Sequence, residues 1–333
     1  MSNSHRFVAI DAWRFIFALL IIWHHLPWIE GHVRWLGYCA VSFFFIASGF
    51  FSAHSDTSDL QKFYLRKFFR IFPIYWIALV VSLLIEAAPV RYIWTSHSVW
   101  DILQHVFLLQ AYSNFETRPM FYYLNGPTWF LCVLVLFYAV LPLLQHWQYQ
   151  SPKWFAIGVV VYSLCAVAVT WLGFDGAYWV RVNMPLVRIS ECLFGMVLAH
   201  WVQDKNISGV HKYISVGVLI LFFIFAYDLP TEYIRPYMSI PMMAYLLVAF
   251  LSCKENKALI YISKMGGVSM EMYIFHHLVI VGLKLVEYMV HYTPPIWLNI
   301  CLVYGLTLLI AILYQHYITP CVNSLEQKAI SRL

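Results

Sequence analysis

The sequence predicts an all-α integral membrane protein with about ten transmembrane helices and with both termini in the cytoplasm. Of its 333 residues, 62% are hydrophobic and only 11% are charged, whereas soluble domains carry about a quarter charged residues. Apolar runs of roughly 17 to 25 residues, long enough to cross a bilayer, recur along the chain. Lysine and arginine gather in alternate connections, as the positive-inside rule requires. These three observations favour a membrane protein over a soluble one.

Ten apolar runs qualify as predicted spans, and most connections between them are short. The runs cover residues 7–28, 36–54, 71–88, 127–145, 154–173, 183–203, 212–229, 236–252, 269–290 and 297–318. The segment 99–112 is too short to span and holds Asp101 and His105, so we expect it to be interfacial or re-entrant. We expect one transmembrane domain over residues 1–333, with no appended soluble domain.

The placement of basic residues supports this topology. With the N-terminus inside, the cytoplasmic side receives Arg6, Lys62, Arg66, Lys67, Arg70, Lys153, Lys205, Lys212, Lys254, Lys257, Lys264, Lys328 and Arg332. The outside receives Arg34, Arg91, Arg118, Arg181 and Arg235. If residues 99–112 crossed the membrane, most of the first set would move outside, against the positive-inside rule. The net charge of +5 is modest, and we expect no nucleic-acid partner.

The first span carries Asp11, Arg14, His24 and His25 within an apolar stretch. Ionisable side chains inside a membrane are costly and mark functional sites by default. At about 100° per residue, Arg14 and His25 share one helix face, about 16 Å apart along the axis. Asp11 is spaced to pair with Arg14. The alternative is a structural ion pair near the membrane boundary, with a histidine at the far headgroups.

A basic cluster precedes the third span. Arg66, Lys67 and Arg70 lie within about one helical turn, and Pro73 suits the start of the span that follows. One interpretation is a binding site for an anionic ligand such as a phosphate. The other is ordinary positive-inside anchoring with an aromatic belt, which composition alone favours.

The ninth span is the second polar helix. Tyr273 lies about one turn before His276 and His277. Lys284 is spaced to pair with Glu287, either for packing or within a functional site.

Three further features favour structural roles. Arg188 and Glu191 lie three residues apart in the sixth span, which favours an ion pair. Ser48 and Gly49 in the second span suit a close approach of two helices. The seven cysteines are scattered singly, without metal-ligand spacing, so we expect no metal site.

Four stretches, taken in order, resemble the acyltransferase-3 family of membrane-bound O-acyltransferases. They are residues 10–14 (IDAWR) followed by His25, residues 43–50 (FFFIASGF), residues 67–76 (KFFRIFPIYW) and residues 272–276 (MYIFH). The resemblance covers almost the whole chain, and it depends on the order and spacing of the motifs. The chain departs from the family after Trp129, where many members carry a serine and a glutamate and this sequence has Cys132, so no carboxylate there is assigned a role.

The resemblance implies transfer of an acyl group, often acetyl from acetyl-CoA, to a hydroxyl of a cell-surface carbohydrate or its lipid-linked precursor. We then expect an enzyme of the bacterial inner membrane, with acyl-CoA as donor substrate and no permanently bound cofactor. His25 is the candidate base because imidazole titrates near neutral pH. The alternative is that His25 is itself acylated. Arg14, oriented by Asp11, stabilises the oxyanion or holds a CoA phosphate. His276 is the second candidate catalytic histidine.

The remaining site predictions concern the two substrates. Lys67, Arg70 and Arg66 are expected to bind the CoA phosphates. Trp129 and Tyr273 are expected to contact the acceptor, with an interfacial anchor as the alternative for Trp129. The alternative functions are a transporter of a small anion or a proton-coupled solute, since intramembrane charges also serve transport, and a scaffold subunit of a glycan export complex.

Overall fold

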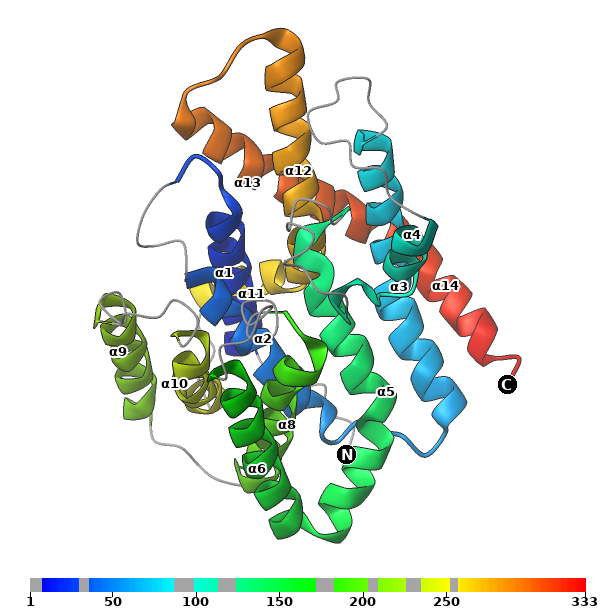
Figure 1. Ribbon diagram of the computed structural model, residues 1–333, viewed down its shortest axis with the longest axis vertical. Coiled ribbons are helices and arrows are strands. Elements are labelled where there is room, and N and C mark those ends of the chain that lie inside the picture. Colours follow the sequence, from blue (N-terminus) through cyan, green and yellow to red (C-terminus); the bar gives the residue numbers. More distant parts are fainter. Residues whose placement is uncertain are drawn as a thin grey trace. The chain divides into compact units, whose positions relative to one another are not determined.

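The computed structural model describes residues 8–29, 36–86, 99–112, 124–171, 183–202, 209–225, 235–251 and 257–333. All regular secondary structure in these ranges is helical (Figure 1), which confirms the all-α prediction. Within the described ranges, seven helices are long and apolar enough to cross a membrane: Val8–His25, Leu60–Ile85, Gly126–Gln150, Pro152–Val169, Pro185–Val202, Ser269–Val290 and Ile296–Ile330. Three shorter apolar helices, Cys39–Ser52, Val210–Phe225 and Met238–Leu251, coincide with the other three predicted spans. The number of ten spans and the side of each terminus stay predictions.

The chain divides into two compact units. Unit 1 comprises residues 1–53 and 191–270, and unit 2 comprises residues 54–190 and 271–333. Helices α8 (Pro185–Val202) and α12 (Ser269–Val290) contribute residues to both. The single domain over 1–333 stays a prediction.

In unit 1, helix α1 (Val8–His25) packs against α2 (Leu36–Ser52), α10 (Arg235–Leu251) and α11 (Lys257–Gly266), and α9 (Val210–Phe225) packs against α10.

Close backbone packing joins α2 to the unit 1 part of α8. A Cβ atom on Gly49 would overlap the Cys192 carbonyl oxygen, and one on Gly195 would overlap the Ile46 carbonyl oxygen. The close helix approach predicted at Gly49 is therefore confirmed. Small residues at such contacts let membrane helices gain van der Waals packing.

In unit 2, helix α3 (Leu60–Glu86) packs against α4 (Val99–Val106), α5 (Trp129–Gln150) and α14 (Thr319–Ile330). The basic cluster, predicted on a helical turn ahead of a span that starts at residue 71, forms the early turns of α3 itself, and the start of the span stays a prediction. Asp59 caps the helix by accepting a hydrogen bond from the Lys62 amide at 3.0 Å. Pro73 lies inside α3, where it removes only one backbone donor and the helix continues on both sides.

Unit 2 also contains α6, the segment 99–112 and the C-terminal helices. Helix α6 (Pro152–Trp171) packs on α5. Residues 99–112 form only α4 and the 3-10 turn η1 (Gln110–Tyr112), which agrees with the prediction of a segment too short to span. The C-terminal run α13 (Ile296–Leu313), η5 (Tyr314–Ile318) and α14 continues past the predicted end at residue 318.

Several basic residues used for the topology lie outside the described residues. They are Arg6, Arg34, Arg91, Arg118, Arg181, Lys205 and Lys254.

Candidate functional site

The predicted ion pair on α1 is present. Arg14 Nη1 lies 3.2 Å from Asp11 Oδ1, and the two side chains are 27% and 17% exposed. Arg14 and His25 belong to one uninterrupted helix, and both are partly buried. An extended guanidinium held by a carboxylate keeps a fixed direction, so Asp11 is placed to orient Arg14.

A glycine of α11 fixes the turn of α1 that carries this pair. A Cβ atom on Gly266 would overlap the carbonyl oxygen of Asp11. The two backbones therefore touch directly, with no side chain between them. Because the contact is made to the backbone of Asp11 itself, the position of the ion pair depends on α11.

The hydrogen bond made by His25 defines its tautomer. His25 Nδ1 lies 2.8 Å from the carbonyl oxygen of Ile21. A carbonyl only accepts hydrogen bonds, so Nδ1 carries the proton and Nε2 of the neutral ring carries the lone pair. The ring of His24 stands edge-on at 4.7 Å between centroids. In the neutral form of His25, Nε2 is therefore the basic nitrogen of the ring.

The three cations of α3 do not share one environment. Arg66 and Arg70 are exposed, whereas Lys67 is half-buried. Lys67 Nζ lies 4.2 Å from the ring centroid of Tyr138 on α5 and 5.3 Å from that of Phe63. These are cation–π distances, so the aromatic faces hold the ammonium while the two guanidinium groups face outward.

Trp129 begins α5 and is paired with a buried arginine. It is 4% exposed, and the Arg188 guanidinium carbon lies 5.3 Å from its ring centroid. Arg188 is itself fully buried. An interfacial anchor would reach the headgroup region, so that alternative for Trp129 does not fit its burial. The contact between Arg188 and Trp129 was not predicted, and the ion pair between Arg188 and Glu191 stays a prediction.

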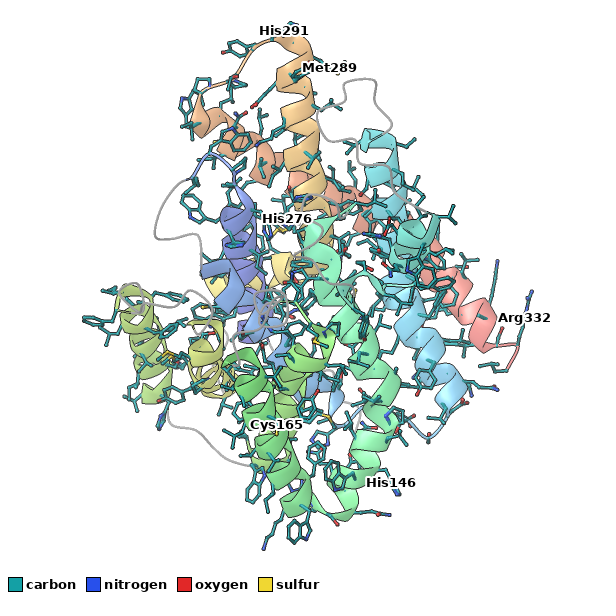
Figure 2. The ribbon with its side chains drawn as sticks, viewed as in Figure 1. His146, Cys165, His276, Met289, His291 and Arg332 are labelled. Carbon is teal, nitrogen blue, oxygen red and sulfur yellow. The ribbon has the colours of Figure 1, made fainter. Side chains whose placement is uncertain are left out.

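Tyr273 and His276 are both buried residues of α12, and Figure 2 labels His276. The Tyr273 hydroxyl donates a hydrogen bond to the Pro127 carbonyl, and its ring packs 5.1 Å from that of Phe130. His276 Nδ1 lies 2.7 Å from the Tyr273 carbonyl oxygen, so its proton is on Nδ1 too. His276 is fully buried, whereas His277 is only partly so. The segment before α5 thus holds the part of α12 that carries His276.

A buried polar network, which the sequence did not predict, lies beside these residues. The Tyr75 hydroxyl donates to the His105 carbonyl at 2.7 Å, and Gln110 Nε2 donates to Tyr75 at 3.4 Å and to Thr128 Oγ1 at 3.2 Å. Thr128 Oγ1 donates to the Asn125 carbonyl at 2.6 Å, and Asn125 Nδ2 reaches the Ile274 carbonyl at 2.9 Å. The run Asn-Gly-Pro-Thr at 125–128 is a strong turn sequence, and it could have indicated this part of the network. Its last three residues form the 3-10 turn η3 (Gly126–Thr128).

The ion pair expected on α12 is not formed. Glu287 instead accepts a hydrogen bond from Asn299 Nδ2 of α13 at 2.6 Å, and Lys284 is exposed. A neutral donor on a neighbouring helix satisfies the carboxylate without the cost of desolvating an ammonium.

The candidate residues fall into two sets. Asp11, Arg14 and His25 belong to unit 1. Unit 2 holds the predicted phosphate-binding and acceptor-binding residues and the second histidine: Arg66, Lys67, Arg70, Trp129, Tyr273 and His276. Their roles stay predictions. Within the described ranges, no group of three or more His, Cys, Asp or Glu side chains is placed to hold a metal ion.

Comparison with known proteins gives two matches of different extent. Residues 7–316 match a family model described as an acyltransferase domain. The chain is also 28% identical over 185 residues to Acyltransferase MdmB of Streptomyces mycarofaciens, a region that covers 50% of this chain and 47% of the relative. The chain thus spans about half the length of the curated relative that it matches. No solved structure matches it.

Proposed function

Because this chain belongs to the acyltransferase domain family that its residues 7–316 match, we propose that it transfers an acyl group, above all acetyl, from acyl-CoA to a hydroxyl. The acceptor is a cell-surface carbohydrate or its lipid-linked precursor, and the enzyme is a multi-pass protein of the bacterial inner membrane. The family and the apolar helices support an enzyme embedded in lipid. The donor, the acceptor and the identity of the membrane belong to the proposal.

The observation that carries the mechanism is the tautomer of His25. With Nδ1 donating to the Ile21 carbonyl, Nε2 is the basic nitrogen. A sugar hydroxyl is a poor nucleophile at neutral pH, so it needs a base with a pKa near 7. His25 takes the hydroxyl proton as the oxygen attacks the thioester carbonyl. The C–S bond then breaks, CoA leaves as thiolate, and the imidazolium returns the proton to sulfur. In the covalent variant of this scheme, Nε2 attacks the thioester first, the C–S bond breaks and CoA leaves as thiolate. The hydroxyl then takes the acyl group from Nε2, and its proton goes to the thiolate.

Arg14 is the proposed electrostatic partner of this step. The tetrahedral intermediate carries an oxyanion, and a cation fixed in advance stabilises it without reorganising during the reaction. The ion pair with Asp11 supplies that fixed direction, and the contact of Gly266 with the Asp11 backbone supplies a rigid base. Holding a CoA phosphate is the other role that suits Arg14.

The residues of unit 2 are proposed to bind the substrates. Arg66 and Arg70 are exposed near the N-terminal end of α3, and their forked guanidinium groups suit phosphate oxygens. Lys67 adds a third cation. Trp129 and Tyr273 are proposed to contact the acceptor, with His276 as a second catalytic residue.

A transfer assay with the purified protein tests the proposal. The protein is incubated with acetyl-CoA labelled in the acetyl group and with membranes that contain the native glycans, and mass spectrometry follows acetylated glycan and free CoA. We expect CoA release together with an added acetyl mass on the glycan. A protein that releases no CoA under these conditions contradicts the proposal and supports transport or a scaffold role instead.

A further inference from the structure

The buried network of unit 2 fixes the orientation of two carboxamide side chains. The Tyr75 hydroxyl gives its proton to the His105 carbonyl, and Thr128 Oγ1 gives its proton to the Asn125 carbonyl. Both hydroxyl oxygens can therefore only accept from Gln110, so the group facing them must be the Gln110 amide nitrogen, Nε2. The Ile274 carbonyl likewise can only accept, which places Nδ2 of Asn125 against it.

The two carboxamide oxygens are left over by this arrangement. Gln110 Oε1 and Asn125 Oδ1 have no hydrogen-bond partner among the described residues, and each side chain is only 1% exposed. A flip of either amide would set oxygen against oxygen, so rotation does not remove the problem. Buried acceptors without donors are rare in folded proteins because desolvating them is costly. The pair therefore calls for a ligand that brings hydrogen-bond donors.

We infer that Gln110 and Asn125 form a subsite for the pantetheine arm of acyl-CoA, whose amide N–H groups and hydroxyl donate to these two oxygens. This inference rests on the proposed function, because it takes acyl-CoA as the donor substrate. A narrow, flexible chain with donors spaced along it suits a subsite inside a helical unit better than a bulky sugar ring does. The amide oxygens accept hydrogen bonds but cannot take the hydroxyl proton, so their role is to position the arm.

Helix α3 links this subsite to the proposed phosphate site. Lys67, Ile71 and Tyr75 follow one another at intervals of four residues, so they lie along one ridge of the helix. The rise from Lys67 to Tyr75 is about 12 Å, which an extended pantetheine arm can cover. Tyr75 contacts Gln110 directly. A CoA molecule with its phosphates at the cations of α3 therefore brings its arm to the two oxygens.

The far end of the subsite leads to α12. Asn125 bonds to the Ile274 carbonyl, and the neighbouring Tyr273 carbonyl accepts from His276. The phosphate cations, the two carboxamides and His276 all belong to unit 2. The arm would thus extend toward the part of α12 that carries Tyr273 and His276, the second proposed catalytic residue.

The test is a double-mutant cycle in which one change is made in the protein and the other in the substrate. Acetyl-CoA is compared with analogues in which one arm N–H at a time is replaced by an ester oxygen, and thioester cleavage is measured for wild type and Gln110→Met. One analogue should lower kcat/KM of the wild type roughly tenfold. With acetyl-CoA, kcat/KM of Gln110→Met should be lower than that of wild type by a similar factor. Replacing acetyl-CoA by that analogue should not lower kcat/KM of Gln110→Met any further. Ser82→Ala is the control, because it removes a buried hydroxyl of α3 that bonds only to its own helix, at the Ala78 carbonyl.

The outcomes separate this inference from the proposed function. Suppose that wild type cleaves acetyl-CoA and that the analogue lowers kcat/KM by the same factor in wild type and in Gln110→Met. This result overturns the subsite and assigns the two oxygens to internal water. A wild type that cleaves no acetyl-CoA overturns the proposed function and the subsite together. If Gln110→Met does not fold, the wild-type series still decides, because analogues that bind and react as well as acetyl-CoA overturn the inference.

Discussion

The two units hold their candidate residues in different ways. In unit 1, Arg14 and His25 lie partly exposed along α1, and each makes a local contact within its own helix, to Asp11 and to Ile21. In unit 2, Trp129, Arg188 and His276 are buried, and Arg188 of α8 lies over the ring of Trp129 of α5. A partly exposed side chain can be removed at little cost to packing, whereas a buried one cannot. Substitutions in unit 1 thus test chemistry, and those in unit 2 test chemistry and stability together.

The largest expected effect is on catalysis by His25. His25→Ala should lower acyl transfer by a hundredfold or more, the usual range for a lost general base, with little change in melting temperature. His24→Ala is the matched control, since the neighbouring ring is equally half-buried and points to another side of α1. Transfer rates and melting temperatures of both variants check this, and near-wild-type activity in His25→Ala would remove the assignment.

The same substitution in unit 2 should behave differently. His276→Ala should lower the free energy of unfolding by about 2 kcal/mol or more, because it empties a fully buried site. Denaturant unfolding in detergent measures this loss. Equal stability losses in His25→Ala and His276→Ala would contradict the contrast between the two units.

A smaller effect is expected where α11 supports α1. Gly266→Ala forces a methyl group against the Asp11 backbone, and such overpacking costs about 1–3 kcal/mol. We also expect reduced transfer, since the turn that carries Asp11 must shift. Gly217→Ala in α9 is the matched control, because nothing lies within 4 Å of a Cβ atom there. A Gly266→Ala protein as stable and active as the Gly217→Ala protein would show that α11 does not position the ion pair.

The cations of α3 should affect binding of the donor more than its chemistry. Arg70→Ala removes an exposed phosphate ligand in the proposal, so we expect KM for acetyl-CoA to rise roughly tenfold with kcat nearly unchanged. Lys153→Ala removes an exposed cation of the same unit from α6 and should change neither constant. Steady-state kinetics with acetyl-CoA distinguish the two, and a fall in kcat alone would argue against phosphate binding.

The smallest effect concerns the cap of α3. Hydrogen bonds from Lys62 lower the pKa of the Asp59 carboxyl below its usual value of 3.8. Because the folded pKa is the lower one, the contribution of Asp59 to stability is present above pH 4 and is lost as the pH falls through the folded pKa. Asp59→Asn should therefore melt slightly below wild type at pH 7, and the difference should shrink as the pH falls below 4. A constant difference across that range would exclude the charge as the cause.

Much of this molecule follows from spacing along the chain. Asp11 and Arg14 pair because residues three apart meet on any helix, and the apolar runs mark the long helices because the bilayer requires that length. The hydropathy of the chain located the span within α3 but not the start of the helix at Leu60, because a hydropathy window ignores a basic amphipathic turn even when an aspartate caps it. Helix α11 was passed over because its ten residues are shorter than a span. The roles of the site residues stay predictions, since no measurement of activity bears on them.

The sequence by itself determined the helical membrane architecture, the polar stripe of α1 and the cations of α3, because each depends on residues one or two turns apart. Only the tertiary structure decided that Gly266 meets the Asp11 backbone, that Arg188 covers Trp129, and that Gln110 and Asn125 leave two oriented oxygens. These contacts join residues far apart in the chain, and hydropathy and helical spacing are the same whichever distant partner a residue meets.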